Sequence, residues 1–278
     1  MQPMVETACH PVRISRIGGE YHARILLDME ILFMTEYDVK ILEKKYIEFI
    51  NIEKMPVYSI ESKKVSLSKA ESEGFDSIAQ TLYKADTQEH ILIIADNVSI
   101  EPYILFHEFT HILDAEVYAK GDKVKYVTSS GYTEYHASQI ELLIMLGAEN
   151  LRDPISFSID QHITTIAGEK TVRQYVGMKR RQAMGLYQRK DFPYSIDQLK
   201  TAFGLLFNYW GLRSICYMYC KDFEEETDNK VLTRFIPVDI LSLMNQLMVG
   251  WLTEEKIDLC CKGYEEMVIP LIKKYKLI

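Results

Sequence analysis

The sequence predicts an α+β fold in which helices predominate, and three observations indicate it. Short β-prone runs occur before residue 96. From residue 99 onward, apolar residues recur at the three- and four-residue spacing of a helix face. Beyond residue 150, β-rich runs become scarce. We therefore expect a small β-sheet with helices in residues 1–150 and a helical part in residues 151–278, with a soft boundary because no Pro/Gly/Ser linker separates them.

The elements before residue 96 follow from local patterns. Alternating apolar and polar residues over Val12–Leu27, interrupted by a pair of glycines, predict a β-hairpin. Residues 35–55 predict a helix, with a capping residue at Thr35 and a proline after the last residue. Residues 57–67 and 90–95 predict two strands, of which the second is β-branched, compact and buried.

A helix is predicted to start near Ser99, which is followed by an acidic residue and a proline, and to end near Lys120 before a glycine. After about a dozen loop residues, a second helix is expected over residues 133–146. In the C-terminal part, Ser195 and its capping partner open an apolar helix that reaches Cys220.

Two further helices are expected at the C-terminal end, over residues 237–252 and 253–275. Pro270 should kink or end the second of them. A basic run over residues 178–190 is interpreted as a solvated helix face.

Charge and composition indicate which partners and which cellular location to expect. The formal net charge is -8, so the surface on average repels phosphate backbones and anionic lipid headgroups, and neither nucleic acid nor a membrane is an expected partner. The five cysteines are odd in number and do not form a disulfide framework. The N-terminal residues lack a secretory signal, and the apolar stretch 199–220 is interrupted by polar residues. We expect a soluble, cytoplasmic protein.

The strongest chemical signal is the pentapeptide His107-Glu108-Phe109-Thr110-His111. Residues four apart on a helix lie one above the other, so the imidazoles of His107 and His111 can converge on one zinc ion. Glu108 is rotated away from that pair, and its carboxylate can act as the general base towards a water molecule. This pattern most often serves peptide-bond hydrolysis.

A catalytic zinc ion needs a third protein ligand. The metzincin pattern is excluded, because Asp114 and Val117 stand where that class has glycine and histidine. A glutamate from a later helix would serve instead, and Glu134, in the first turn of the second predicted helix, is the expected ligand. Glu141 is the leading substitute, and His136 is a further candidate that should point to another side of the helix.

Three other residues are candidates for supporting roles. Asp114 shares a helix face with the two histidines and could orient a ligating imidazole. Tyr132, close to Glu134 in the sequence, is the expected residue for stabilising an oxyanion during carbonyl attack. His162 in the C-terminal part is a more distant candidate for that role.

From Ile91 to Leu146 a strand, a short loop, the HEFTH helix and a helix carrying Glu134 follow one another. This order resembles gluzincin-type zinc metallopeptidases, and in particular the ImmA/IrrE-like family. The resemblance implies a zincin-like catalytic part, zinc bound by His107, His111 and Glu134, Glu108 as base, and a cytoplasmic protein as substrate. Thr110 departs from the glycine that this family usually has before its second histidine.

Three functions are compatible with these residues. We expect a zinc metallopeptidase acting on a protein or peptide. A metal-binding regulatory or protein-interaction module would keep the metal site without turnover. A zinc hydrolase of another acyl bond would use the same residues, because zinc-bound hydroxide attacks other acyl groups as well. Intact His107, Glu108 and His111 favour an enzyme.

Overall fold

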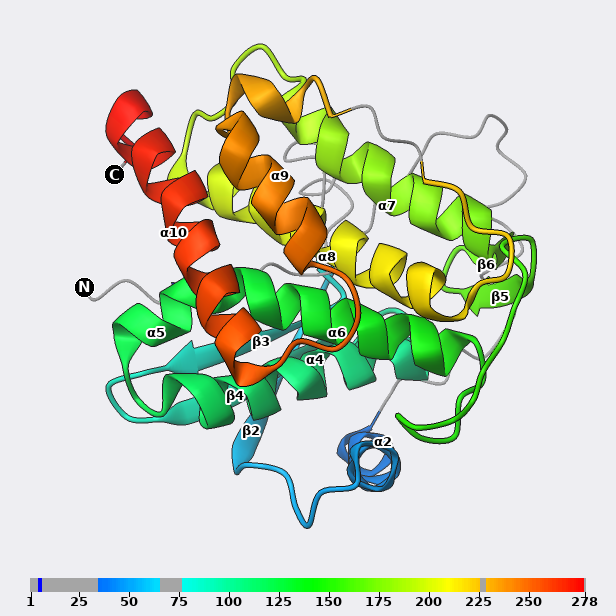
Figure 1. The fold of residues 1–278 in the computed structure, drawn as a ribbon. Coiled ribbons are helices and arrows are strands. Elements are labelled where there is room, and N and C mark those ends of the chain that lie inside the picture. The colour runs from blue at the N-terminus through cyan, green and yellow to red at the C-terminus, as the bar shows by residue number, and fades with distance from the viewer. Residues whose placement is uncertain (1–4, 7–34, 66–76, 226–228, 278) are drawn as a thin grey trace, which may run out of the picture.

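A computed structural model describes residues 5–6, 35–65, 77–225 and 229–277 of the chain. It has an α+β architecture in which helices predominate, as the sequence predicts. Figure 1 shows the sheet at one side of the molecule. Helices α4 and α6 run alongside each other next to the sheet, and α7 and α8 lie beyond α6. The predicted hairpin over Val12–Leu27 lies outside the described residues.

The larger sheet has the strand order β1-β3-β4-β2. Strand β4 (Glu89–Ala95) lies inside it, parallel to β2 (Tyr58–Lys63) and antiparallel to β3 (Ala79–Lys84). The predictions of β2 and β4 are confirmed. Strand β3 was not predicted, and the two-residue strand β1 (Val5–Glu6) pairs with it.

Helix α2 (Glu36–Ile50) begins with a capping box between Thr35 and Asp38, as predicted from the sequence. It ends at Asn51, which adopts a left-handed conformation. Its buried side chains, among them Tyr46 and Phe49, contact Phe106 of the next helix. This packing fixes one side of α4.

Helix α4 (Pro102–Asp114) carries the HEFTH sequence and continues as a π-helical turn, η1 (Ala115–Ala119). Lys120 ends this stretch, as predicted, but the N-cap is Glu101 and not Ser99. A short helix, α5 (Lys123–Thr128), occupies the expected loop, and α6 (Ser130–Met145) begins three residues earlier than the sequence predicted.

The C-terminal part begins with a small hairpin that was not predicted and continues as helices. Helix α10 continues through Pro270, which was expected to kink or end it. The elements are β5 (His162–Thr165), β6 (Gly168–Thr171), α7 (Val172–Tyr187), α8 (Ile196–Tyr219), η2 (Leu232–Arg234), α9 (Val238–Leu247) and α10 (Glu254–Tyr275).

Helices α6 and α8 cross at very short range because Gly211 lies at the contact. A Cβ atom on Gly211 would stand 2.2 Å from the carbonyl oxygen of Tyr135. Buried hydrogen bonds lie beside the crossing, from Tyr135 to Ser214 and from Ser138 to Asn208. Apolar residues from both sides of residue 150 form one buried cluster, and the expected domain boundary stays a prediction.

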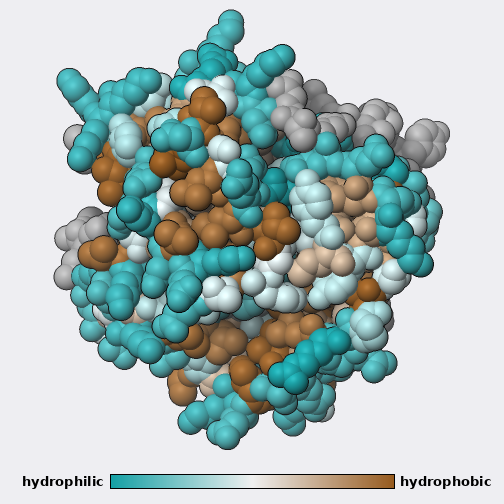
Figure 2. Space-filling view, viewed as in Figure 1, coloured by the Kyte–Doolittle hydropathy of each residue, from teal (hydrophilic) through white to brown (hydrophobic). Residues whose placement is uncertain are grey.

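The outer helices α9 and α10 also expose apolar side chains. Figure 2 shows apolar surface in the region where Figure 1 draws these two helices, interrupted by hydrophilic residues. The exposed apolar residues of α9 and α10 include Val238, Leu243, Leu259 and Ile269.

Candidate metal centre

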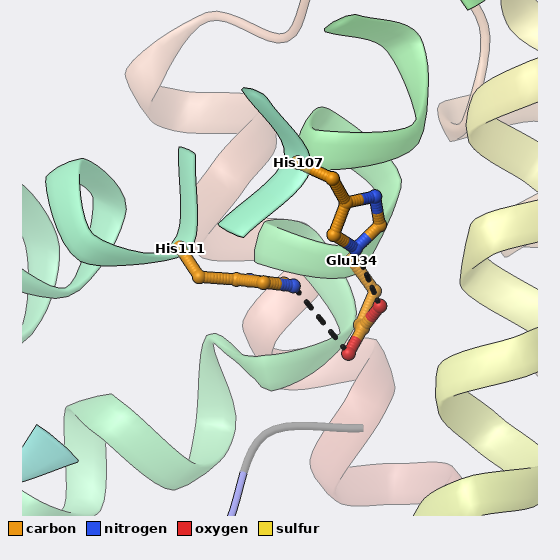
Figure 3. Close-up of side chains that lie close together, drawn as sticks. All are labelled: His107, His111 and Glu134. Atoms are coloured by element: carbon orange, nitrogen blue, oxygen red, sulfur yellow. Dashed lines mark ion pairs between the residues drawn. The ribbon is translucent and has the colours of Figure 1, made fainter. Parts of the chain in front are cut away.

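Helix α4 places His107 and His111 one turn apart with their rings turned toward α6. The two ring centroids are 4.8 Å apart. Both side chains are buried, because α4 packs between the sheet and α6. Figure 3 shows the rings pointing toward one carboxylate, that of Glu134.

Glu134 comes from the second turn of α6, not from the first turn as predicted, since α6 begins at Ser130. Its Oε2 atom is 3.6 Å from Nε2 of His107, and its Oε1 atom is 3.7 Å from Nε2 of His111. Ligand atoms at about 2.0–2.1 Å from a tetrahedral zinc ion lie roughly 3.3 Å from one another. The ligand atoms of the three residues all lie within 4.8 Å of one another, so the donors suit such an ion.

Each of these three side chains also has a polar partner outside the group of three. Glu141 Oε2 is 3.0 Å from Nδ1 of His107, and Thr133 Oγ1 is 3.2 Å from Nδ1 of His111. Asn208 of α8 donates a hydrogen bond of 2.9 Å to Oε2 of Glu134. Such partners fix the orientation of ligating rings and carboxylates, and they turn both Nε2 atoms toward the same point.

Glu108 lies on the sheet-facing side of α4. The hydroxyl of Thr81, on β3, donates to Oε2 of Glu108 at 2.9 Å, while the buried Oε1 atom of Glu108 has no hydrogen-bond partner. Burial raises the pKa of Glu108 to about 7, against the opposing effects of His107 and the Thr81 hydrogen bond. A carboxyl group with this pKa can both accept and release a proton near neutral pH.

The surroundings of His107 favour a cation. Burial alone would lower the pKa of His107, but the neighbouring carboxylates of Glu134 and Glu141 raise it to about 9 through their charges and their contacts with the ring nitrogens. Burial also raises the pKa of Glu134, and its interactions with His107 oppose this. Carboxylates that stabilise a proton on an imidazole also stabilise a metal ion at the same place.

Asp114 and His136 pair with each other, which corrects the expected role of Asp114. Nδ1 of His136 is 3.0 Å from both carboxylate oxygens of Asp114, and this contact joins the end of α4 to α6. The carboxylate behind His107 belongs to Glu141 instead.

Tyr132 lies close to this pair. Its ring stacks on His136, and its hydroxyl is 3.3 Å from that of Tyr118. Neither contact involves the three candidate ligands, and the oxyanion role of Tyr132 stays a prediction. His162, the more distant candidate, is exposed on β5 with Glu169 as its neighbour.

Sequence reasoning missed several residues of this site, among them Thr81, Asn208 and Lys179. Thr81 belongs to the strand that was not predicted, and Asn208 lies inside an apolar helix where it resembled an interruption. Lys179 was assigned to a solvated basic face, but it is 5 % exposed and lies 3.5 Å from Glu141. The signal for Lys179 was its helical spacing from the buried residues Val172, Tyr175, Val176 and Ala183.

Comparison with protein-family models, curated proteins and solved structures finds no match to this chain. In the described part of the chain, none of the helices is both long and apolar enough to span a membrane. The function is therefore inferred from the chemistry of the site.

Proposed function

We propose that the chain is a zinc-dependent metallopeptidase of the gluzincin type, which hydrolyses peptide bonds of a protein or peptide substrate. The convergence of His107, His111 and Glu134 within 4.8 Å carries the proposal. The resemblance of the HEFTH segment to ImmA/IrrE-like metallopeptidases supports it, as does Glu108 on the same helix.

The donor set suits zinc better than a hard cation. Two imidazole nitrogens and one carboxylate form a common ligand set of catalytic zinc, whereas calcium and magnesium prefer oxygen ligands throughout. Three buried carboxylates, those of Glu108, Glu134 and Glu141, lie here, and the buried ammonium group of Lys179 forms an ion pair with Glu141. A divalent cation would compensate the excess negative charge.

In this function, His107, His111 and Glu134 would hold the zinc ion. A bound zinc ion would lower the pKa of a coordinated water molecule and polarise the scissile carbonyl. Glu108 accepts the proton of the attacking water and then donates it to the leaving nitrogen. Thr81 keeps the carboxylate of Glu108 in place for both transfers.

The experiment is metal analysis of the purified protein, followed by cleavage of a peptide library. We expect about one zinc ion per chain for wild type and for Glu108→Gln, because Glu108 is not a ligand. Turnover by Glu108→Gln should fall by about 10²- to 10⁴-fold, the usual contribution of a general base.

Glu101→Gln is the matched control, since the Glu101 side chain forms no cap hydrogen bond at the start of the same helix. It should cleave at the wild-type rate. Wild type that takes up no zinc, or Glu108→Gln that cleaves as fast as wild type, would contradict the proposal.

One observation favours a second candidate, a metal-binding module without turnover. The side chains of His107, Glu108, His111 and Glu134 are at most 2 % exposed, and such burial is typical of a closed metal site without a position open to substrate. Zinc bound equally by wild type and Glu108→Gln, with no cleavage by either, would identify this second function.

A further inference from the structure

Glu141 lies on the side of His107 that faces away from the candidate ion, and its two carboxylate oxygens have different partners. Oε2 is 3.0 Å from Nδ1 of His107, whereas Oε1 accepts a hydrogen bond from the hydroxyl of Tyr175 and lies 3.5 Å from Nζ of Lys179. Glu141 thus joins the histidine on α4 to two residues of α7.

Helix α7 brings both partners to Glu141 by its register. A capping box between Thr171 and Gln174 fixes its start, and Tyr175 and Lys179 follow one turn apart on the same face. The ammonium group of Lys179 also lies 5.3 Å from the centroid of the Tyr175 ring. The Tyr175 hydroxyl remains a donor, because burial raises the pKa of Tyr175 well above its usual value.

Lys179 differs from the other basic residues of its helix. Arg181, two residues later, is exposed to solvent, whereas the side chain of Lys179 is 6 % exposed and faces a fully buried carboxylate. Burying such a pair contributes little net stability, because the loss of hydration offsets the attraction. Stability alone therefore gives no reason for a lysine at this core position.

We propose that Lys179 and Tyr175 are positioning residues of the metal centre, which act through Glu141 to hold the His107 ring in its ligating orientation. This inference rests on the proposed function. Lys179 compensates the charge of Glu141 within the core, and Tyr175 fixes the rotation of its carboxylate, so that Oε2 faces Nδ1 of His107. Helix α7 of the C-terminal part thereby becomes necessary for tight metal binding by residues of the N-terminal part.

The experiment measures zinc affinity by competition with a chelator at one fixed pH, together with the visible absorption spectrum of bound Co²⁺. Loss of a partner behind a ligating histidine typically weakens metal binding by about 10- to 100-fold. We expect a loss of about tenfold or more for Lys179→Met and about tenfold for Tyr175→Phe, with an altered Co²⁺ spectrum in both. Lys179→Arg should recover most of the affinity, since it restores the charge.

Lys190→Met is the matched control, because it makes the same chemical change at an exposed position just beyond α7. It should bind zinc like wild type. Thermal unfolding of the metal-free proteins separates a folding defect from a metal-binding defect. If Lys179→Met does not fold, Tyr175→Phe decides, since it removes only a hydroxyl.

The outcomes separate this inference from the proposed function. Wild type that binds no zinc would overturn both. Wild type that binds zinc tightly, with unchanged affinity and Co²⁺ spectrum in the folded Lys179→Met or Tyr175→Phe variant, would overturn this inference alone. If Lys179→Met weakens zinc binding and Lys179→Arg weakens it equally, the role assigned to the charge of Lys179 is overturned.

Discussion

At the scale of single residues, the candidate site depends on which partner faces each polar atom. His107 has Glu141 on one side and Glu134 on the other, and His111 has Thr133 and Glu134. Such pairs leave the imidazoles little rotational freedom. A preorganised ligand set of this kind binds a metal ion more tightly than a flexible set of the same ligands.

Thr81→Val tests whether the hydroxyl of Thr81 controls the protonation of Glu108. The Thr81 hydrogen bond lowers the pKa of Glu108, which burial raises to about 7. Without that bond the pKa should rise further. Because Glu108 must be deprotonated to act as a base, the acid limb of the kcat/KM profile should move to higher pH, with a larger loss of rate at pH 6 than at pH 8.

Zinc content should not change in Thr81→Val. Thr164→Val, at an exposed position on β5, is the control and should leave the profile in place. A Thr81→Val variant with the wild-type profile would show that this hydroxyl does not act on the base.

At the scale of elements, the sequence predicted those parts whose signals are local. The capping signal at Thr35 located α2, and the proline near the start of α4 and the Lys120-Gly121 stop signal located the helical stretch of α4 and η1. Strand β3 was missed because its burial depends on β4 and α4, which lie elsewhere in the sequence. Local pattern cannot carry such information.

The same distinction applies to the site. His107, Glu108 and His111 follow from spacing on one helix, and Glu134 from a motif on the next. Asn208 reaches Glu134 because α8 packs on α6, and Lys179 reaches Glu141 because α7 packs on α8. Their roles depend on the tertiary packing of these three helices, which the local sequence does not reveal.

Gly211→Ala tests the close crossing of α6 and α8. The added Cβ would lie 2.2 Å from the carbonyl oxygen of Tyr135, so the helices must separate. We expect the free energy of unfolding to fall by about 2 kcal/mol or more, as for other overpacked cores. Zinc affinity should fall as well, because Asn208 on the same helix would move away from Glu134.

Gly185→Ala on α7 is the control, because no atom lies within 4 Å of its added Cβ. That change should raise the free energy of unfolding by about 0.5–1 kcal/mol, since alanine is the better helix former. Both values come from urea unfolding curves. Equal effects of the two substitutions would mean that the crossing can relax without cost.

At the scale of the whole molecule, the ligands come from one half of the chain and several of their supporting residues come from the other. The three candidate ligands lie before residue 150, whereas Tyr175, Lys179 and Asn208 lie after it. The buried apolar cluster also includes residues from both halves. We therefore expect the helical part to unfold together with the metal site.

The two tryptophans of the chain, Trp210 and Trp251, allow a direct test of this coupling, because both lie in the C-terminal half. A ligand at one hundred times its dissociation constant stabilises the folded state by about 2.7 kcal/mol. For a chain of this size, that corresponds to a rise in Tm of roughly 5 °C. Tryptophan fluorescence should therefore report this rise when zinc is added, although neither indole is a metal ligand.

His111→Ala, which removes one candidate ligand, should show no such rise at the same zinc concentration. A rise seen by far-UV circular dichroism but not by tryptophan fluorescence would mean that the two halves unfold separately. In that case, the contacts of α7 and α8 with the site would be too weak to couple them. If both signals report the same rise in Tm, zinc bound by α4 and α6 stabilises helix α8, which begins more than sixty residues after Glu134. Only a core shared by the two parts of the chain can transmit this stabilisation.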